Sequence, residues 1–226
     1  MPVVYKKVTD DYTFGLWLIQ ESMEELTLDL ILSEKEERQL EKFGSVLRKK
    51  QWIVTRALTS DLLRLKKGAT IEYDQHGKPF IPSSTWKISI SHSGAYVGVM
   101  LSNKGEVGMD LEYADPRILG IAPRFLNDEE YERLRSGADP IEKITVAWSA
   151  KESVYKLLGS GKFSFSKDLM TAPFDLATQG SLLVEVSESG FLKGTFLVNF
   201  EKGEWEGYAT KEPLLLTWVL DPSERT

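Results

Sequence analysis

The segment VGMDLEY, residues 107–113, carries two carboxylates that could act together. Asp110 and Glu112 are two residues apart in a strand-like run, and side chains at that spacing project from one face of a strand. Met109 and Leu111 then point to the opposite side. An ordinary half-buried strand with its polar side in water also explains this pattern. The two carboxylates become a candidate site only in combination with other groups.

A second set of polar side chains lies in the helical segment AWSAKESVYKLLG, residues 147–159. Trp148, Glu152 and Lys156 follow one another at four-residue steps, so they share a helix face. The plain alternative is a surface helix with a Glu152–Lys156 ion pair, which contributes about 0.3 kcal/mol. A tryptophan on a merely solvated face is unusual, because large aromatic side chains are mostly buried or placed at contacts. The pattern therefore favours a helix that lines a cleft.

The strand end SHS, residues 91–93, offers hydroxyl groups and an imidazole beside Gly94. Ser91 and His92 cannot form a nucleophile–base pair, because neighbours on a strand point to opposite faces. The sequence also lacks the G-x-S-x-G elbow of a hydrolase. A purely structural histidine remains an alternative, and contact with a phosphate is the sharper hypothesis.

Two further cations are candidates for ligand contacts. Lys78 lies in the turn GKP, where Pro79 adds a stiff apolar surface suited to a flat ring. Arg56 lies in an amphipathic helix predicted from Ser45 to Lys67, with Gly68 as its C-cap. Because most helix charges are surface charges, Arg56 can equally be a solvated edge residue.

Composition limits the classes of function. The chain has 226 residues, no cysteine and a net charge of −6. Disulfides, thiolate zinc sites and a cysteine nucleophile are therefore excluded, and a nucleic-acid-coating role is disfavoured because it needs a broad basic face. The N-terminus lacks the features of a signal peptide and no stretch is apolar enough to span a bilayer. A cytoplasmic protein without membrane contact is expected.

The elements alternate between helices and strands in two successive groups. Capping boxes at Ser22, Ser33 and Asn127 predict short helices, and Asp139 followed by Pro140 opens a longer one that ends near Leu158. The predicted strands are 14–19, 70–73, 86–90, 96–101, 106–113, 181–187, 191–200, 206–211 and 214–220. Helix followed by sheet thus occurs twice, with a border near residues 103–106.

Four motifs occur in a characteristic order: GKP at 77–79, SISHS at 89–93, VGMDLE at 107–112 and WSAKESVYK at 148–156. In that order they resemble the 4′-phosphopantetheinyl transferases of the larger, surfactin-synthetase-activating type. The last two motifs are specific, the first two are supportive, and the resemblance covers essentially the whole chain. One departure is Ser89, where that family commonly has asparagine.

The resemblance implies an α+β pseudo-dimer of two similar halves with coenzyme A and Mg²⁺ in the cleft between them. The expected halves are residues 1–104, which contact the phosphates and adenine of coenzyme A, and residues 105–226, which carry the metal carboxylates and the catalytic helix. Because the two halves are internal to one chain, a monomer is expected.

The resemblance also implies roles for individual residues. The expected metal ligands are Asp110, Glu112 and Glu152, and the expected catalytic residues are Glu152 and Lys156. The expected contacts to coenzyme A are Lys156 near the reacting phosphate, Ser91 and His92 on the phosphates, Lys78 and Pro79 at the adenine and ribose, and Arg56 at the 3′-phosphate.

The implied reaction is attack by a serine hydroxyl of an acyl or peptidyl carrier protein on the phosphorus that bears the pantetheine arm, which expels 3′,5′-ADP. Such holo-carrier-protein synthesis serves lipid or secondary-metabolite biosynthesis. Glu152 is the candidate base, acting directly or through a metal-bound water. Carrier proteins are typically acidic, so the stretch PRILGIAPRFL, with Arg117 and Arg124, is the candidate dock, although it can also be a plain connecting helix.

Two hypotheses from other classes stay open. A Mg²⁺-dependent phosphohydrolase acting on a nucleotide-like substrate could use the same carboxylates. A catalytically silent binding module would keep the fold and coenzyme A but transfer nothing.

Overall fold

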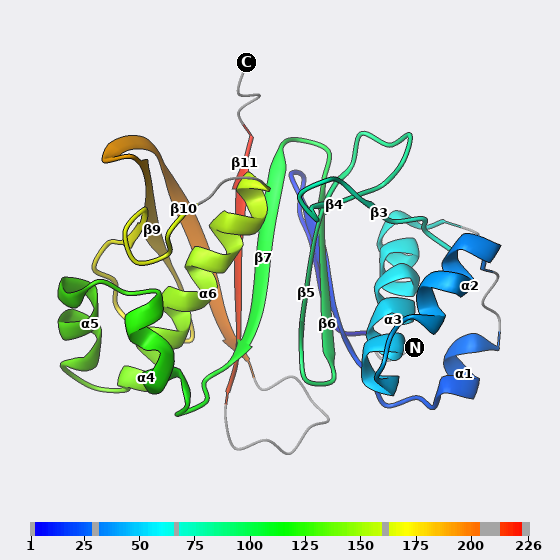
Figure 1. Ribbon diagram of the computed structural model, residues 1–226, viewed down its shortest axis with the longest axis horizontal. Coiled ribbons are helices and arrows are strands. Elements are labelled where there is room, and N and C mark those ends of the chain that lie inside the picture. The colour runs from blue at the N-terminus through cyan, green and yellow to red at the C-terminus, as the bar shows by residue number, and fades with distance from the viewer. Residues whose placement is uncertain (1–2, 29–31, 66–67, 160–162, 204–212, 223–226) are drawn as a thin grey trace.

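The computed structural model describes residues 3–28, 32–65, 68–159, 163–203 and 213–222. Two antiparallel sheets with helices on their outer sides form the molecule (Figure 1). The first sheet has the strand order β1-β2-β6-β5-β4-β3 and the second has the order β7-β11-β10-β9-β8. This confirms the α+β class expected from the sequence.

All strands of the first sheet come from residues 3–102. They are β1 (Val3–Val8), β2 (Thr13–Leu18), β3 (Glu72–Tyr73), β4 (Pro79–Phe80), β5 (Lys87–Ser93) and β6 (Tyr96–Ser102). The helices of this region are α1 (Met23–Thr27), α2 (Glu34–Glu41) and α3 (Val46–Leu63). Both predicted capping boxes form, at Ser22 and at Ser33. The edge strand β1 and the two-residue strand β4 were not predicted.

The predicted long helix ends earlier than its sequence pattern suggested. Arg64, not Gly68, is the C-cap of α3, with a φ of 54° in the left-handed region. Its backbone N–H donates to the carbonyls of Asp61 and Ser60, which satisfies carbonyl groups left open at the helix end. The prediction of Gly68 as the cap was therefore wrong, because the turn closes before the glycine is reached.

All strands of the second sheet come from residues 106–221. They are β7 (Glu106–Tyr113), β8 (Leu169–Thr171), β9 (Gln179–Glu188), β10 (Phe191–Gly203) and β11 (Leu214–Asp221). The helices are α4 (Ile118–Ile121), α5 (Asp128–Arg135) and α6 (Pro140–Leu158), with a 3-10 turn η1 (Ala122–Arg124). The predicted strand 206–211 lies outside the described residues, and the short strand β8 was missed.

Three of the four apolar cores among the described residues hold the layers together. Apolar side chains of α3 pack on one face of the first sheet, and those of α6 pack on one face of the second. Between the sheets, Phe14 and Met100 of the first meet Met109, Leu111 and others of the second. Met109 and Leu111 thus face the inter-sheet core, as their alternation with Asp110 and Glu112 predicted.

Strand β7 is joined to β5 of the other sheet through side chains. Two serines of β5 accept hydrogen bonds from the backbone of β7: Ser89 Oγ from the N–H of Met109 at 3.0 Å, and Ser91 Oγ from the N–H of Leu111 at 3.2 Å. Both serines are buried, so these bonds satisfy N–H groups that would otherwise lack a partner. Ser89, where the resembling family commonly has asparagine, therefore links the two sheets.

Within the described part of the chain, none of the helices is both long and apolar enough to cross a membrane.

Candidate active site

Gly108 allows helix α6 to lie directly on strand β7. A Cβ atom at Gly108 would be 1.8 Å from the carbonyl oxygen of Ser153 and 2.9 Å from the backbone nitrogen of Leu157. A larger residue would therefore push the helix away from the strand. This close approach brings Lys156, on α6, to Asp110, on β7.

The Asp110 carboxylate is the centre of a buried polar cluster. Asp110 Oδ1 accepts hydrogen bonds from Lys156 Nζ at 2.7 Å and Ser91 Oγ at 2.8 Å, and Oδ2 accepts one from Ser149 Oγ at 2.9 Å. Lys156 Nζ also donates to Ser91 Oγ at 3.0 Å. The cluster thus combines β5, β7 and α6. Lys156 forms its ion pair with Asp110, so the alternative of a simple Glu152–Lys156 surface pair was wrong.

Glu112 and Glu152 experience the charge of Asp110. Burial, followed by repulsion from Asp110, raises the pKa of Glu112 to about 7. The pKa of Glu152 is raised by the same two causes in the same order, and Lys156 opposes the shift in both residues. Three carboxylates therefore lie close enough to repel one another, with one lysine to compensate them. A bound cation would relieve this repulsion.

The carboxylates fit a hard divalent cation by their chemistry. Across the described ranges, no three His, Cys, Asp or Glu side chains already converge as a set of metal ligands. The Asp110 oxygens accept three hydrogen bonds, and the charge of Asp110 contributes to the raised pKa of Glu112 and Glu152. Mg²⁺ prefers oxygen ligands and binds through one or two carboxylates plus phosphates and waters. The donor set suits such partial coordination.

Ser91 and His92 have different contacts, as expected for neighbours on a strand that point to opposite faces. Ser91 contacts Asp110 and Lys156, whereas the imidazole Nε2 of His92 contacts the guanidinium of Arg48 on α3. Burial lowers the pKa of His92, and the charges of Arg48 and Lys156 lower it further. A histidine whose pKa is lowered by two nearby cations lies in an environment that suits an anion. Sequence analysis missed Arg48, because only the fold brings α3 and β5 together.

Lys78 bridges the two sheets at the other end of the junction. Lys78 Nζ donates to the carboxylate of Glu106 and to the carbonyl of Leu157, both at 2.6 Å. Lys87 also pairs with Glu106 at 2.6 Å. These residues border a hollow of about 820 Å³ that is lined from both sides of the junction. Pro79 lies in β4, opposite Tyr73 of β3. Lys78 thus contacts the end of α6 rather than the Asp110 cluster.

Arg56 is buried, so the interpretation as a solvated surface residue was wrong. It is 2% exposed, and its guanidinium stacks on Trp52 with 3.4 Å between the guanidinium carbon and the ring centroid. It also donates to the carbonyl of Ile71 at 3.1 Å and pairs with Glu36 at 3.4 Å. Burial lowers the pKa of Arg56, which the charge of Glu36 partly offsets. None of these partners of Arg56 belongs to the Asp110 cluster.

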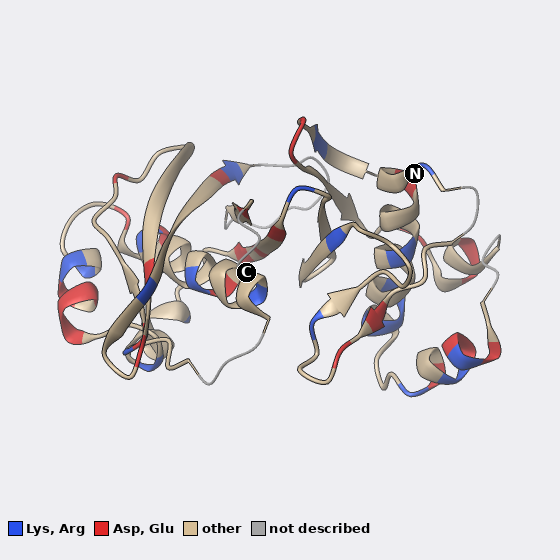
Figure 2. Cartoon of the chain, turned by 90° about the horizontal axis from the view of Figure 1, so that it is seen from above, with Lys and Arg blue, Asp and Glu red and all other residues tan. Residues whose placement is uncertain are grey.

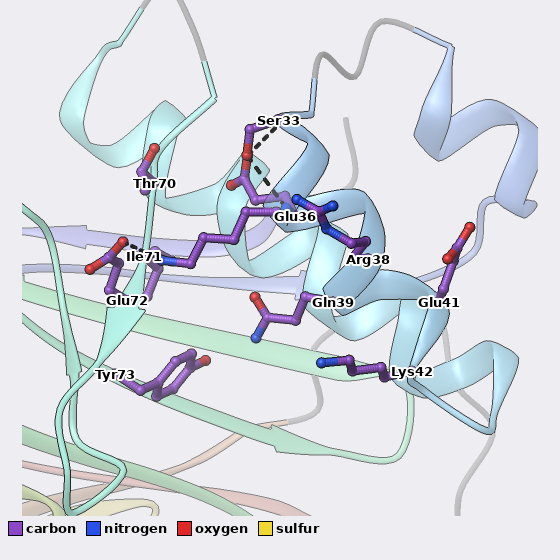
Figure 3. A pocket seen from close by; sticks show the side chains of 11 residues that line it. Ser33, Glu36, Arg38, Gln39, Glu41, Lys42, Thr70, Ile71, Glu72 and Tyr73 are labelled. Carbon is purple, nitrogen blue, oxygen red and sulfur yellow. Dashed lines mark hydrogen bonds and ion pairs between the residues drawn. The ribbon is translucent and has the colours of Figure 1, made fainter.

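A hollow of about 880 Å³ lies between helix α2 and strand β3 (Figure 3), and two of its lining residues, Glu36 and Ile71, are the partners of Arg56. Lys35, Arg38 and Lys42 line it together with Glu36, Glu72 and other residues of both elements. Two of the three cations are already paired with carboxylates, Lys35 with Glu72 and Arg38 with Glu34. This hollow shares no residue with the Asp110 cluster.

A second buried ion pair on α6 was missed by the sequence analysis. Lys151 is fully buried, and its Nζ donates to Glu130 Oε2 at 2.8 Å and to the carbonyls of Phe125 and Phe165 at 2.8 Å and 3.0 Å. The other oxygen of Glu130 accepts from the N–H and hydroxyl of Thr171, both at 2.8 Å. A lysine within the apolar stripe of a helix was the available signal, because such a position requires a buried partner.

Trp148 packs against aromatic side chains near α4. Its ring centroid is 4.7 Å from that of Phe125 and 5.3 Å from that of Phe165. Tyr155 contacts the same Phe165 ring at 5.3 Å. These contacts explain why a tryptophan occupies this position of α6, and they tie the helix to the region around α4 and η1.

Comparison with known proteins matches the part of the chain that carries most of these residues. Residues 106–214 match the model of the 4′-phosphopantetheinyl transferase superfamily. The chain is 33% identical over 141 residues to the 4′-phosphopantetheinyl transferase ffp of Bacillus subtilis, which covers 60% of this chain and 61% of that protein. It is 29% identical over 141 residues to 4′-phosphopantetheinyl transferase Sfp of Bacillus subtilis strain 168, covering 61% of each.

A third relative is the 4′-phosphopantetheinyl transferase AcpT of Escherichia coli O157:H7, which is 32% identical over 117 residues, or 50% of this chain and 59% of that protein. The chain thus spans about 60% of the length of these curated relatives. The matched region contains Asp110, Glu112, Glu152 and Lys156, and the resemblance inferred from the motifs is confirmed. Residues 106–214 of this chain are thus similar to the 4′-phosphopantetheinyl transferase superfamily.

Proposed function

We propose that this protein transfers the 4′-phosphopantetheine arm of coenzyme A to a serine of an acyl or peptidyl carrier protein and releases 3′,5′-ADP. The observation that carries this proposal is the Asp110–Lys156 pair with Glu112 and Glu152 beside it, at the junction of the two sheets and inside the family match. In the reaction, the serine oxygen forms a bond to the arm's phosphorus and the bond from that phosphorus to the leaving phosphate breaks.

Lys156 is the proposed group that stabilises charge on the reacting phosphates. Its side chain is 27% exposed, and its Nζ donates to Asp110, to Ser91 and to the carbonyl of Met109. A phosphate oxygen would take the place of one of these acceptors. A fixed positive charge beside a transferring phosphoryl group lowers the barrier, since negative charge spreads over its oxygens in the transition state. Ser91 and His92, with Arg48 behind the imidazole, are the proposed contacts to the remaining phosphate oxygens.

Glu152 is the proposed base that takes the proton of the attacking serine. Its burial and the charge of Asp110 raise its pKa, and a carboxylate with a raised pKa accepts a proton more readily. Transfer through an intervening water is the alternative route. In either route the proton leaves the serine as its oxygen bonds to phosphorus, and the leaving phosphate departs with 3′,5′-ADP.

The proposed Mg²⁺ would be held by Asp110, Glu112 and Glu152. When bound, it would neutralise charge on the pyrophosphate of coenzyme A, which is the chemistry that such ions supply in phosphoryl transfer. The mutual repulsion of the three carboxylates supports this assignment, because a cation would remove it. Lys156 would keep the Asp110 carboxylate oriented in the meantime.

The proposed seat of coenzyme A is a cleft between two similar halves, residues 1–104 and 105–226. Each half packs one long helix, α3 or α6, on an antiparallel sheet, which supports a pseudo-dimer. The 820 Å³ hollow beside Lys78 is a proposed place for the adenine and ribose, with Pro79 nearby. Arg56 would bind the 3′-phosphate only if its bonds to Glu36 and Ile71 were rearranged.

The proposed carrier-protein dock is the stretch from Arg117 to Arg124. It forms α4 and η1, and Leu119 and Ile121 are 37% and 39% exposed on it. Lys and Arg occur in both halves, together with Asp and Glu (Figure 2). An acidic partner therefore needs a local match, and two arginines around exposed aliphatic side chains supply one.

A mass spectrum of an apo carrier protein incubated with this protein, coenzyme A and Mg²⁺ tests the proposed function. We expect a mass gain of one phosphopantetheine arm, with equimolar 3′,5′-ADP. A phosphohydrolase would instead release pantetheine phosphate without any carrier protein. A silent binding module would bind coenzyme A and leave the carrier mass unchanged.

A further inference from the structure

The side of the Asp110 carboxylate that faces away from Lys156 is held by a residue with no role so far. Ser149 Oγ, on α6, donates to Asp110 Oδ2 at 2.9 Å. Ser149 is fully buried, and Asp110 is 5% exposed. An ionised carboxylate only accepts hydrogen bonds, so the single hydroxyl proton of Ser149 must point at Asp110.

Two more buried hydroxyls extend this contact into the core. Thr217 Oγ1, on β11, is 2.9 Å from Ser149 Oγ, and Ser153 Oγ is 2.7 Å from Thr217 Oγ1. Because the Ser149 proton is committed to Asp110, Thr217 must be the donor toward Ser149. Thr217 also lies 2.9 Å from the carbonyl of Ser149, so its one proton is shared between two acceptors of the same residue. Ser153 then donates to Thr217, so hydroxyl donors run from Ser153 through Thr217 and Ser149 to Asp110.

We propose that Ser149 is a positioning residue that fixes the plane of the Asp110 carboxylate. The torsion about the last bond of an aspartate is soft, so donors at Oδ1 alone define the plane less well than donors at both oxygens. Ser149 at Oδ2 and Ser91 with Lys156 at Oδ1 hold it from both sides. The lone pair that these bonds leave on Asp110 Oδ2 then faces a fixed direction, which a metal ligand requires. This inference rests on the proposed function, because it concerns the cation of that site.

Ser153 provides a matched control on the same helix. It lies one turn after Ser149, is also fully buried and also contacts Thr217. Its hydroxyl bonds are to Thr217 Oγ1 and the Thr217 carbonyl, not to Asp110. Ser149→Ala and Ser153→Ala each remove one buried hydroxyl, so they should destabilise the fold by similar amounts. Only Ser149→Ala should affect the cation.

The experiment measures Mg²⁺ binding by titration calorimetry and, separately, the Mg²⁺ concentration for half-maximal transfer to a carrier protein. We expect Ser149→Ala to weaken Mg²⁺ binding about tenfold and to raise the Mg²⁺ concentration for half-maximal transfer by a similar factor, an effect typical of residues that orient metal ligands. Ser153→Ala should change both quantities by less than about twofold. Similar unfolding midpoints of the two variants would show that stability is not the cause. If Ser149→Ala does not fold, Thr217→Val, which removes the donor to Ser149, takes its place with a smaller expected loss.

Equal effects of the two serine variants on Mg²⁺ binding, or no effect of Ser149→Ala, would overturn the inference, as would a wild-type chain that binds no Mg²⁺. Wild-type protein that binds Mg²⁺ but modifies no carrier protein would contradict the proposed function alone. In that case the calorimetric difference between Ser149→Ala and Ser153→Ala still tests the role of Ser149.

Discussion

Helix α6 carries two lysine–carboxylate pairs whose surroundings differ. Lys151 and Glu130 are 0% and 1% exposed at their side chains, and each charged group is surrounded by hydrogen-bond partners. Lys156 and Asp110 are 27% and 8% exposed, with Glu112 and Glu152 close enough to repel Asp110. We call Lys151–Glu130 the closed pair, because both side chains are shielded from solvent and their charges cancel. We call Lys156–Asp110 the open pair, because it is partly exposed and lies beside two further carboxylates. A closed pair fits a structural role, and an open, unbalanced pair fits the binding of ions and phosphates.

The largest effect is expected when the closed pair is broken. Lys151→Met should lower the free energy of unfolding by about 3–5 kcal/mol, because it leaves Glu130 charged and buried without its partner. Denaturant unfolding monitored by circular dichroism measures this loss. Lys151→Met combined with Glu130→Gln should regain part of it, and Mg²⁺ should restore none. A single Lys151→Met variant as stable as wild type would remove the structural role from this pair.

The corresponding change in the open pair should affect transfer more than folding. Lys156→Met should lower the transfer rate about 100- to 1,000-fold, since one positioned charge at a reacting phosphate has an effect of this size. It also leaves Asp110 without its counter-charge, so the variant should be modestly less stable and should regain stability when Mg²⁺ is added. Thermal unfolding with and without Mg²⁺ checks this point. If Mg²⁺ restored the stability of Lys151→Met but not that of Lys156→Met, the assignment of the cation to the open pair would be wrong.

Within the open region, Glu152 should act on the rate rather than on binding. Glu152→Gln should slow transfer about 100-fold, the usual contribution of a positioned base, while it weakens coenzyme A binding far less. Single-turnover transfer and calorimetric binding of coenzyme A separate the two quantities. Unchanged turnover would remove Glu152 from the role of base.

Glu112 should make the stability of the protein depend on pH. In the unfolded chain this carboxyl ionises near pH 4.5, but in the fold its pKa is about 7. Between these values the folded state holds a proton that the unfolded state has lost, so stability falls as pH rises and levels off above about pH 7. Glu112→Gln should therefore raise stability at pH 8 by about 2 kcal/mol relative to wild type and have little effect at pH 4. Equal pH slopes for both proteins would contradict the raised pKa.

The smallest effect is expected at the proposed dock, which lies outside both pairs. Arg117→Glu with Arg124→Glu should raise the Michaelis constant for carrier protein about tenfold at low salt, and by less at high salt, with little change in the maximal rate. A double reversal at Arg135 and Lys193 is the control for net charge. If the dock variant modifies carrier protein with the normal Michaelis constant, the docking assignment is wrong.

The sequence pattern predicted the parts of the site that depend on local periodicity. The two-residue spacing of Asp110 and Glu112 correctly placed them opposite Met109 and Leu111, and the Asp139–Pro140 start correctly predicted α6. The order of the motifs identified the family. These features could be predicted because strand alternation and helix capping are properties of neighbouring residues.

Contacts between distant elements could not be predicted in the same way. Arg56 is buried because α3 packs with Trp52, Glu36 and Ile71 around it, which no local pattern specifies. The Arg48–His92 contact similarly depends on where α3 meets β5. Lys156 has a carboxylate four residues before it in the sequence, yet it pairs with Asp110 because Gly108 allows α6 to approach β7.

The most direct test of the central claim, that chemistry belongs to the open pair on α6, is the mass of a carrier protein after reaction with wild-type protein and with Asp110→Asn. Both reactions contain coenzyme A and Mg²⁺, and circular dichroism verifies that the variant is folded. We predict that the wild type adds one phosphopantetheine arm and that folded Asp110→Asn adds none in the same time. An Asp110→Asn variant that modifies the carrier protein at the wild-type rate would contradict this account.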